Sequence, residues 1–369
     1  MKNKIMFVID SKLTFSEAPP SRFIYIAKSL KKRGFEVTVL GRKGERINSL
    51  QTHQISGSKH VSRLKILLHA YTKTLSHSYD TIIVRGGLLT FLLLPLKILG
   101  KKIILDFHGW LFQEIELFFK KTMYNKLKAF FYYFIERIAA KNSSAIICNS
   151  KGFRRLLGQM EGKPIIVLEN GVNVEEGVKA VHDAKQEKDQ IYKKNSIPEN
   201  KPLIGFLGNW HRYNDMETMF KGAEIAKAHG VVIGEGPDLN EFKKLWSNVT
   251  FTGRLERYEA LKTIGLCNAA IVPLKSIYYP TRKVKDYLGL GKPIIMANVK
   301  EREAYLIPNQ NVLLYEPGNA EDLADKIRTI ISNKKLAQEM HKNNLKLARK
   351  FDWQILVEQS KLIEKILKN

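Results

Sequence analysis

Short runs of aliphatic residues alternate with helical segments along this chain, in two successive series. The first series includes residues 4–9, 35–41, 81–85 and 102–107. Within these runs apolar and polar residues do not alternate, which is typical of parallel strands that helices cover on both faces. The pattern therefore predicts a doubly wound α/β fold.

A second series of the same kind begins at residue 202, after a polar and charged segment. A chain of 369 residues is long enough for two domains. We predict a first domain over residues 1–175, a linker over 176–200 and a second domain over 201–351. The helix over residues 352–369 is expected to cross back to the first domain. Two such domains facing each other would form a deep cleft.

The chain is strongly basic, with a formal net charge of +25, and residues 1–180 carry 30 Lys and Arg against 13 Asp and Glu. This excess favours an anionic partner: nucleic acid, an anionic membrane surface or a phosphorylated substrate. A lysine-rich composition without function would produce the same charge.

Cys148 and Cys267 lie in apolar contexts, which favours buried thiols in the cytoplasm. The most apolar segment, residues 88–99, is too short to span a membrane, and the N-terminal run does not read as a signal peptide.

Ligands of doubly wound sheets collect at the carboxyl ends of the strands. In the first series these ends carry Asp10, Arg85-Gly86-Gly87, His108-Gly109 and Asn149-Ser150. In the second they carry Gly208-Asn209, Gly234-Glu235-Gly236-Pro237, Gly253-Arg254 and Pro273-Leu274. We expect the functional residues among these positions.

Six blocks in the same order resemble the retaining glycosyltransferases of the two-Rossmann-domain (GT-B) type, specifically the large family 4. They are RGFEVTVL, CNSKGFRRLL with ENGVN, IGFLGNWHRYNDMETMFKGAEIA, VIGEGP, FTGRLERYEALKTIGLCNAAIVPL and PTRKVKDYLGLGKPII. The resemblance implies two Rossmann-like domains and transfer of a sugar from a nucleotide-diphosphate sugar with retention. It implies no cofactor, and without a DxD pattern at a strand end we expect no metal.

The resemblance places the donor in the second domain. The family's diphosphate loop carries a basic pair, and here both basic positions, Asn209 and Asn214, are Asn. We assign donor contacts to residues of this loop and of the later blocks, with positive charge supplied by the basic ones. These residues are Gly208, Asn209, Arg212, Glu235, Gly236, Arg254, Tyr278, Lys283 and Asp286, and Arg282 is a further source of charge.

Two acids separated by seven residues form another family motif, and Tyr278 replaces the first of them. The second matches Asp286, which the resemblance assigns to the ribose hydroxyls. Lys283 and Asp286 share a helix face, with Pro280 able to start that helix and Gly289 able to end it, and the free N–H groups at a helix start suit phosphate. An ordinary surface ion pair would have the same spacing. The loop at Gly236 would likewise serve as a plain tight turn.

His108 is the first-domain residue that the resemblance assigns to the transferred sugar, and a structural histidine is the alternative. We count His108 and Lys283 as catalytic, because both would stabilise charge in the transition state. For the acceptor we assign Ser16, Ser21, Arg22 and Arg85. Ser21 would equally serve as the N-cap of the helix that follows it.

Residues 114–141 combine basic and aromatic side chains in a helical pattern. Met123, Leu127, Phe130, Phe134 and Ile138 have the spacing of a stripe that faces the core. The pattern leaves over a set of basic and aromatic residues: Phe119, Lys120, Lys121, Lys126, Lys128, Phe131, Tyr132, Tyr133 and Arg137. This surplus suits a helix that lies on an anionic membrane.

These observations predict a cytoplasmic, metal-independent glycosyltransferase, peripheral on the inner membrane face. Its partners would be a nucleotide-sugar donor and a glycan or lipid-linked acceptor. A nucleotide-sugar epimerase of the same fold and a non-catalytic partner subunit are the alternatives. Nucleic-acid binding is not expected, because no RNA- or DNA-binding module pattern is present.

Overall fold

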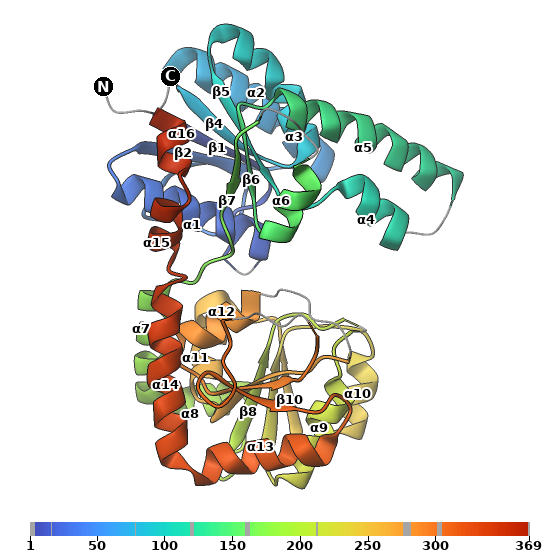
Figure 1. Ribbon diagram of the computed structural model, residues 1–369, viewed down its shortest axis with the longest axis vertical. Helices are drawn as coiled ribbons and strands as arrows, with labels where there is room; N and C mark the ends of the chain where they lie inside the picture. Colours follow the sequence, from blue (N-terminus) through green and yellow to red (C-terminus); the bar gives the residue numbers. More distant parts are fainter. Residues whose placement is uncertain are drawn as a thin grey trace. The chain divides into compact units, whose positions relative to one another are not determined.

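A computed structural model of the chain describes residues 4–15, 17–77, 79–118, 122–158, 163–211, 213–275, 282–300 and 305–367. The chain forms two compact units (Figure 1). Unit 1 comprises residues 1–170 and 353–369, and unit 2 comprises residues 171–352. This division lies close to the predicted one, and residues 353–369 belong to unit 1 although they follow unit 2 in the sequence.

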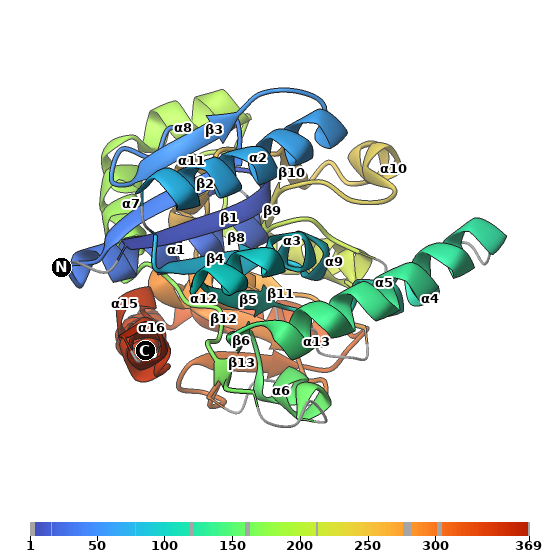
Figure 2. The same ribbon diagram turned by 90° about the horizontal axis from the view of Figure 1, so that it is seen from above.

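Unit 1 is built on a seven-stranded parallel sheet of order β3-β2-β1-β4-β5-β6-β7 (Figure 2). Its strands are β1 (Lys4–Lys12), β2 (Glu36–Arg42), β3 (Gln51–Ile55), β4 (Thr81–Arg85), β5 (Lys102–Phe107), β6 (Ala145–Cys148) and β7 (Ile165–Val167). The strand order reverses between β1 and β4, which is the switch point where doubly wound sheets bind their ligands.

Helices cover both faces of this sheet because its strands are apolar on both sides. One face packs on α1 (Ala18–Lys32), α15 (Trp353–Gln359) and α16 (Leu362–Leu367). The other packs on α2 (Lys59–His77), α3 (Gly87–Leu93), η1 (Leu94–Leu99), α5 (Met123–Asn142) and α6 (Lys151–Leu157). A further helix, α4 (Leu111–Phe118), contacts α5.

Unit 2 repeats the design with a six-stranded parallel sheet of order β10-β9-β8-β11-β12-β13. The strands are β8 (Leu203–Leu207), β9 (His229–Ile233), β10 (Val249–Gly253), β11 (Ala269–Val272), β12 (Ile294–Ala297) and β13 (Val312–Tyr315). The helices are α7 (Val174–Gln186), α8 (Lys188–Asn195), α9 (Met216–Ile225), α10 (Leu239–Leu245), α11 (Arg257–Gly265), α12 (Arg282–Gly289), α13 (Ala320–Ser332) and α14 (Lys334–Arg349). The two doubly wound units confirm the predicted fold class.

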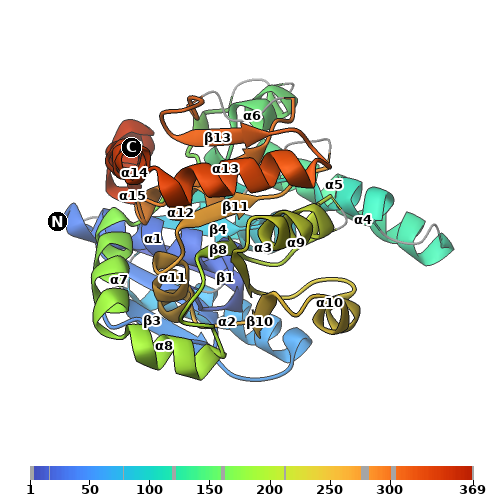
Figure 3. The same cartoon turned by 90° about the horizontal axis from the view of Figure 1, so that it is seen from below.

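The predicted linker over residues 176–200 is wrong, because these residues form most of α7 and all of α8 within unit 2. Figure 3 shows both helices beside α11. At Gly177 a β-carbon would lie 2.4 Å from the carbonyl oxygen of Gly289, so α7 packs directly on the end of α12. The polar sequence reflects the outer faces of two short helices and not a free connection.

The predicted core stripe of α5 is also wrong. Met123, Leu127, Phe130, Phe134 and Ile138 are all exposed, between 41% and 71% of their full area. The side of α5 that packs inward carries mainly small residues and one carboxylate: Ala129, Ile135, Glu136, Ala139 and Ala140. A small-residue face lets the helix approach its neighbours closely, and the large apolar residues are left on the outside. Phe119, Lys120 and Lys121 lie outside the described residues.

Ser21 is not the N-cap of α1. The helix begins at Ala18, three residues earlier, with Glu17 as its N-cap and proline in its first turn. Proline fits there because the first N–H groups of a helix have no partner within it. Ser21 is then fully buried within the helix.

Candidate functional site

A cavity of about 250 Å³ lies in unit 1 at the carboxyl ends of β1, β4 and β5. Arg85 and His108 line it from the strand ends, and Gly86 and Gly87 line it at the start of α3. Helices α2 and α5 complete the wall with Arg63, Tyr132 and Glu136. The predicted residues Arg85 and His108 therefore share one pocket, at the switch point of the sheet.

Asp106 organises the charged groups beside this pocket. Its side chain is 1% exposed, and its oxygens lie 2.9 Å from Arg85 Nη1, 3.2 Å from His108 Nε2 and 3.7 Å from Arg22 Nε. Burial alone would raise the pKa of Asp106, but the cationic groups around it outweigh burial and hold the pKa below its ordinary range. Asp106 is therefore an ionised carboxylate that fixes Arg85 and His108 in place.

His108 is a neutral imidazole at pH 7. Burial lowers its pKa to about 4, against the opposing charge of Asp106. An ionised carboxylate only accepts hydrogen bonds, so the proton of the neutral ring lies on Nε2 and is donated to Asp106. This tautomer leaves Nδ1 as an acceptor, which suits a substrate hydroxyl.

A second carboxylate, Asp10 at the end of β1, positions another arginine of the pocket. Its oxygens lie 2.5 Å from Arg63 Nε and 3.3 Å from Arg42 Nε. Arg63 comes from α2, far from any strand end, and the sequence patterns did not identify it. The sequence of α2, which is otherwise apolar and basic, does not indicate that Arg63 pairs with a distant carboxylate.

Two of the predicted acceptor residues have other roles. Arg22 is 2% exposed and donates to the carbonyl oxygens of Leu168 at 2.6 Å and Glu169 at 3.0 Å. The Arg22 guanidinium thus holds the segment after β7 in place. It lies beside Asp106 but does not line the pocket. Ser21 is fully buried as well and is not exposed to an acceptor. Both assignments are therefore wrong. Ser16 lies outside the described residues, and Arg85 stays a predicted acceptor contact.

In unit 2 the loops after β8 and β9 pack directly on each other. Asn209 Oδ1 accepts from the backbone N–H of Glu235 at 3.2 Å, and Trp210 Nε1 donates to the carbonyl oxygen of Pro237 at 2.9 Å. A β-carbon on Gly236 would lie 2.4 Å from the ring of buried Trp210. The glycine that was predicted as a ligand contact is thus required by packing.

Lys283 lies in the first turn of α12, next to the loop after β8. Its Nζ sits 3.8 Å from the ring centre of Phe206, and its Cε is 3.7 Å from where a β-carbon of Gly208 would be. Gly208 has a φ of +109°, so it is the natural residue at this turn. Burial lowers the pKa of Lys283 to about 7. The amine is therefore poised between its charged and neutral forms.

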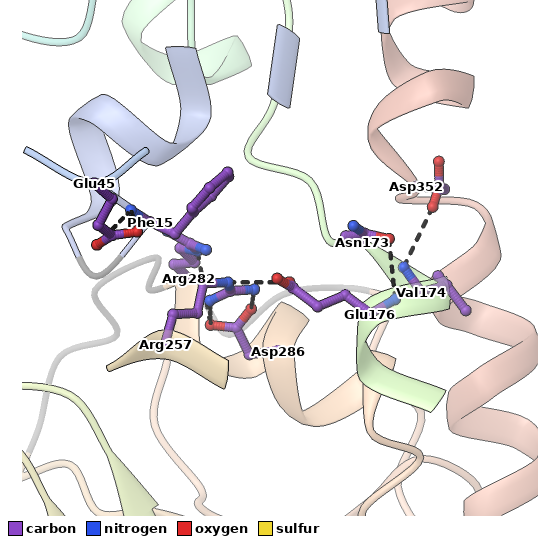
Figure 4. Close-up of polar contacts among 9 residues, drawn as sticks. All are labelled: Phe15, Glu45, Asn173, Val174, Glu176, Arg257, Arg282, Asp286 and Asp352. Atoms are coloured by element: carbon purple, nitrogen blue, oxygen red, sulfur yellow. Dashed lines mark hydrogen bonds and ion pairs between the residues drawn. The ribbon is translucent and has the colours of Figure 1, made fainter. Parts of the chain in front are cut away.

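Asp286 is 5% exposed and is held by arginine (Figure 4). Arg257 forms a bidentate pair with it, at 2.9 Å and 3.4 Å, and also lies 3.1 Å from Glu176. Arg282 Nε is 3.7 Å from Oδ2 of Asp286. Lys283 and Asp286 thus contact different partners although they are three residues apart.

The sequence patterns missed Arg257, the residue that binds Asp286, and named Arg254 instead. Arg254 is exposed, at the residue after β10. Arg257 begins α11, and its partner is distant in the sequence, so no local spacing reveals the pair. Arg212 and Tyr278, two further predicted donor contacts, lie outside the described residues.

Two family models match the chain in succession. Residues 21–176 match Glycosyltransferase Family 4, and residues 187–347 match Glycosyl transferases group 1. The first falls almost entirely in unit 1 and the second entirely in unit 2. Each unit is therefore recognised by its own model, in the order that the resemblance predicted.

The chain is 25% identical over 235 residues to an uncharacterized glycosyltransferase of Methanocaldococcus jannaschii, covering 62% of this chain and 61% of that protein. It is 24% identical over 228 residues to the N,N'-diacetylbacillosaminyl-diphospho-undecaprenol alpha-1,3-N-acetylgalactosaminyltransferase of Campylobacter jejuni, covering 59% and 58%. These matches span about six tenths of the curated relatives' length.

The solved structures match over almost the whole chain. The sucrose-phosphate synthase of Thermosynechococcus elongatus has a TM-score of 0.73 at 18% identity, with 99% of both chains covered. HepE of Anabaena in complex with UDP-glucose has a TM-score of 0.67 at 16% identity, covering 99% of this chain and all of that one. At such identities these two likenesses show the fold alone. Together with the two family models, they establish that the chain belongs to the GT-B glycosyltransferases, of a type similar to family 4.

Proposed function

We propose that this protein transfers a sugar from a nucleotide-diphosphate sugar to a glycan or lipid-linked acceptor, with retention of configuration. The observation that carries the proposal is the pocket of unit 1, where buried Asp106 holds Arg85 and a neutral His108 at the switch point of the sheet. Donor recognition is assigned to unit 2, as in the family resemblance.

The chemistry requires charge stabilisation more than proton transfer, because a nucleoside diphosphate leaves with its negative charge. Lys283 suits this task, since an approaching diphosphate would favour its charged form and raise its pKa above 7. The first turn of α12, which carries Lys283, would add the partial positive charge of a helix start. His108 would accept a hydrogen bond from a hydroxyl of the transferred sugar.

The acceptor would be held by the pocket of unit 1, where Arg63 and Arg85 are paired with the carboxylates of Asp10 and Asp106 and where Glu136 is a third carboxylate. These groups supply hydrogen-bond donors and acceptors for the hydroxyls of a glycan, and the Campylobacter relative is named for a diphospho-undecaprenol acceptor. The proposal includes a reaction without a metal ion and a cytoplasmic location. The two cysteines are buried free thiols, which fits a reducing compartment. No helix of the described residues is long and apolar enough to cross a membrane.

A thermal-shift panel of UDP, GDP, ADP and their sugars tests donor binding, because a ligand that binds only the folded state raises the melting temperature. Release of the nucleoside diphosphate is then measured with and without candidate acceptors, in the presence and absence of EDTA. Acceptor-dependent release that survives EDTA supports the proposal. Conversion of the donor to its epimer without an acceptor would identify an epimerase, and no turnover with tight binding would identify a non-catalytic subunit.

A further inference from the structure

Exposed apolar side chains are concentrated on one side of unit 1. Of the eighteen large apolar residues exposed in the described part of the chain, thirteen lie on α2, η1 and α5. They are Val61, Leu64, Leu68, Leu75, Ile98, Leu99, Met123, Tyr124, Leu127, Phe130, Phe131, Phe134 and Ile138. We call the outward sides of these three helices, together with that of α3, the outer face. Exposed apolar patches of this extent mark interaction surfaces.

The outer face is continuous, because α3 contacts both α2 and α5. Tyr71 of α2 donates its hydroxyl to the carbonyl oxygen of Leu92 at 2.7 Å, and Lys97 of η1 donates to that of Asn142 at 2.7 Å. Between η1 and the end of α5 lies an apolar hollow of about 540 Å³ that includes Phe91 and Ile98. The helices thus form one surface and not separate patches.

The first half of α5 extends beyond the edge of the sheet, with α4 beside it (Figures 1 and 2). Three of its aromatic side chains, Tyr124, Phe130 and Phe131, are 55–71% exposed. A surface helix of a globular protein normally turns such residues inward. Here the inward side is occupied by small residues, so the outward aromatics are available for a partner.

The charges on the outer face are almost entirely positive. Helices α2, α3, η1 and α5 carry nine Lys and Arg, of which Arg63 lines the pocket. The other eight are Lys59, Lys65, Lys73, Lys97, Lys126, Lys128, Arg137 and Lys141. Glu136 is the one carboxylate in these four helices. It is 2% exposed and faces inward, where it accepts from the backbone N–H groups of Leu111 and Phe112.

We propose that the outer face docks on an anionic lipid bilayer, with α5 lying in the plane of the interface. Aromatic and aliphatic side chains would enter the boundary between headgroups and acyl chains, and the lysines would reach the anionic headgroups. The absence of surface carboxylates from these helices favours a negatively charged surface over a protein partner of mixed charge.

The same helices line the unit 1 pocket with their inner sides, through Arg63 of α2, Leu89 of α3 and Tyr132 of α5. Docking would therefore hold the pocket within one helix diameter of the lipid headgroups. This consequence rests on the proposed function, and it assigns the acceptor to the membrane-bound class.

Co-sedimentation of the full chain with vesicles tests the docking. Phosphatidylcholine vesicles are compared with vesicles that also contain phosphatidylglycerol, each at low and high salt. We expect binding only to the anionic vesicles, and weaker binding at high salt. The variant Lys126→Glu/Lys141→Glu should bind about 25-fold less tightly or worse, at about fivefold for each basic residue lost near the surface.

An apolar variant and its matched control test whether the outer face itself inserts into the vesicles. Leu127→Ser/Phe130→Ser/Phe134→Ser should lose vesicle binding at least about tenfold, because the inserted apolar area is removed. The control, Leu245→Ser/Ile307→Ser, removes exposed apolar residues of unit 2 and should bind vesicles like the wild type. All five substituted positions are exposed, and melting temperatures verify that every variant folds.

Two results would overturn the docking. One is a wild type that stays in the supernatant with anionic vesicles at low salt. The other is self-association of the wild type through the outer face, abolished by the apolar variant, without vesicle binding. Sugar transfer to a soluble acceptor analogue, measured on the same preparations, keeps the two proposals apart. Transfer without docking refutes the docking alone, whereas docking without any transfer refutes the proposed function alone.

Discussion

Both units contain a nearly buried aspartate clamped by two arginines, and the two clamps differ in charge balance. In unit 1 Asp106 meets Arg22 and Arg85, with a neutral histidine as its third neighbour. In unit 2 Asp286 meets Arg257 and Arg282, and Glu176 lies against Arg257 as a second carboxylate. Two arginines therefore share one carboxylate in the first clamp and two in the second.

This difference in charge balance bears on which ligand groups each unit can bind. The clamp of unit 1 has one positive charge more than it has carboxylates, and the pocket beside it adds the carboxylates of Asp10 and Glu136, which suit the hydroxyls of a sugar acceptor. The clamp of unit 2 balances its own charges, so under the proposed function the diphosphate of the donor would be met by Lys283 and not by the clamp. Substitutions in the two clamps should thus have unequal effects.

The largest effect is expected for Asp106→Asn. This change leaves two arginines beside a neutral amide, and one of them, Arg22, is 2% exposed. Breaking a buried ion pair from one side costs about 3–5 kcal/mol, because the remaining charge has no partner. Denaturant unfolding should show this loss in the free energy of unfolding. A loss below about 1 kcal/mol would mean that the carbonyls around Arg22 suffice to hold it.

The matched variant in unit 2, Asp286→Asn, should destabilise less, by about 2–4 kcal/mol, because Arg257 keeps Glu176 as an anionic partner. The same unfolding measurement applies to both variants. An equal or larger loss than in Asp106→Asn would contradict the difference in charge balance between the clamps.

Lys283→Ala should weaken nucleotide-sugar binding by about 1.5–3 kcal/mol and leave stability nearly unchanged. The pH dependence gives an internal control. With the pKa of free Lys283 lowered to about 7, donor affinity should be highest below pH 7 and fall as the pH rises above it. Calorimetric titration should find this fall in the wild type and a flat profile in the variant. Unchanged affinity in Lys283→Ala would remove Lys283 from the donor site and favour Arg254.

The smallest effect is expected at His108, in turnover. His108→Ala should lower kcat about tenfold, or about 1.4 kcal/mol, with little change in donor affinity. His229 in unit 2 is the matched control, since burial also lowers its pKa to about 4 while its ring contacts Thr250. His229→Ala should keep the wild-type kcat. Full activity of His108→Ala at saturating donor would leave the histidine a structural role only.

Acid should affect both histidines in the same direction. Their folded-state pKa values lie below the ordinary value of 6.5, so the folded state disfavours the proton. The stability linked to each neutral ring is therefore complete above pH 6.5 and is lost as the pH falls through about 4. If His108 acts as an acceptor in the reaction, kcat should decline as the pH falls through about 4, where the folded-state ring takes up its proton, and in His229→Ala it should decline equally.

The strand-helix alternation predicted the fold because its signal is distributed over many residues, and no single contact decides it. Strand ends were equally visible, so Arg85, His108 and Gly208 could be named in advance. The partners of these residues could not. Arg63 and Arg257 come from helices, and they reach their carboxylates across separations of 53 and 29 residues that leave no local pattern.

Periodicity failed on α5 for a different physical reason. A 4-3-4-4 spacing fixes that the large apolar residues share a face, but not whether that face points toward the protein. On α5 the side that packs on the protein carries the small residues Ala129, Ala139 and Ala140, which allow close packing. Arg22 shows a different error, since a basic residue of the segment that follows the first strand was assigned to the acceptor, whereas its guanidinium donates to backbone carbonyls.

The return of the chain to unit 1 after residue 352 has a consequence for biosynthesis. Trp353 stacks on Tyr25 at 5.8 Å, and Lys102 donates to the carbonyl oxygen of Ile366 at 2.8 Å, so α15 and α16 complete a face of the first sheet. The ribosome makes these helices only after the whole of unit 2. During translation unit 2 can therefore finish folding before unit 1. Until α15 and α16 are made, the apolar side of α1 stays exposed, so it can bind chaperones or cause aggregation.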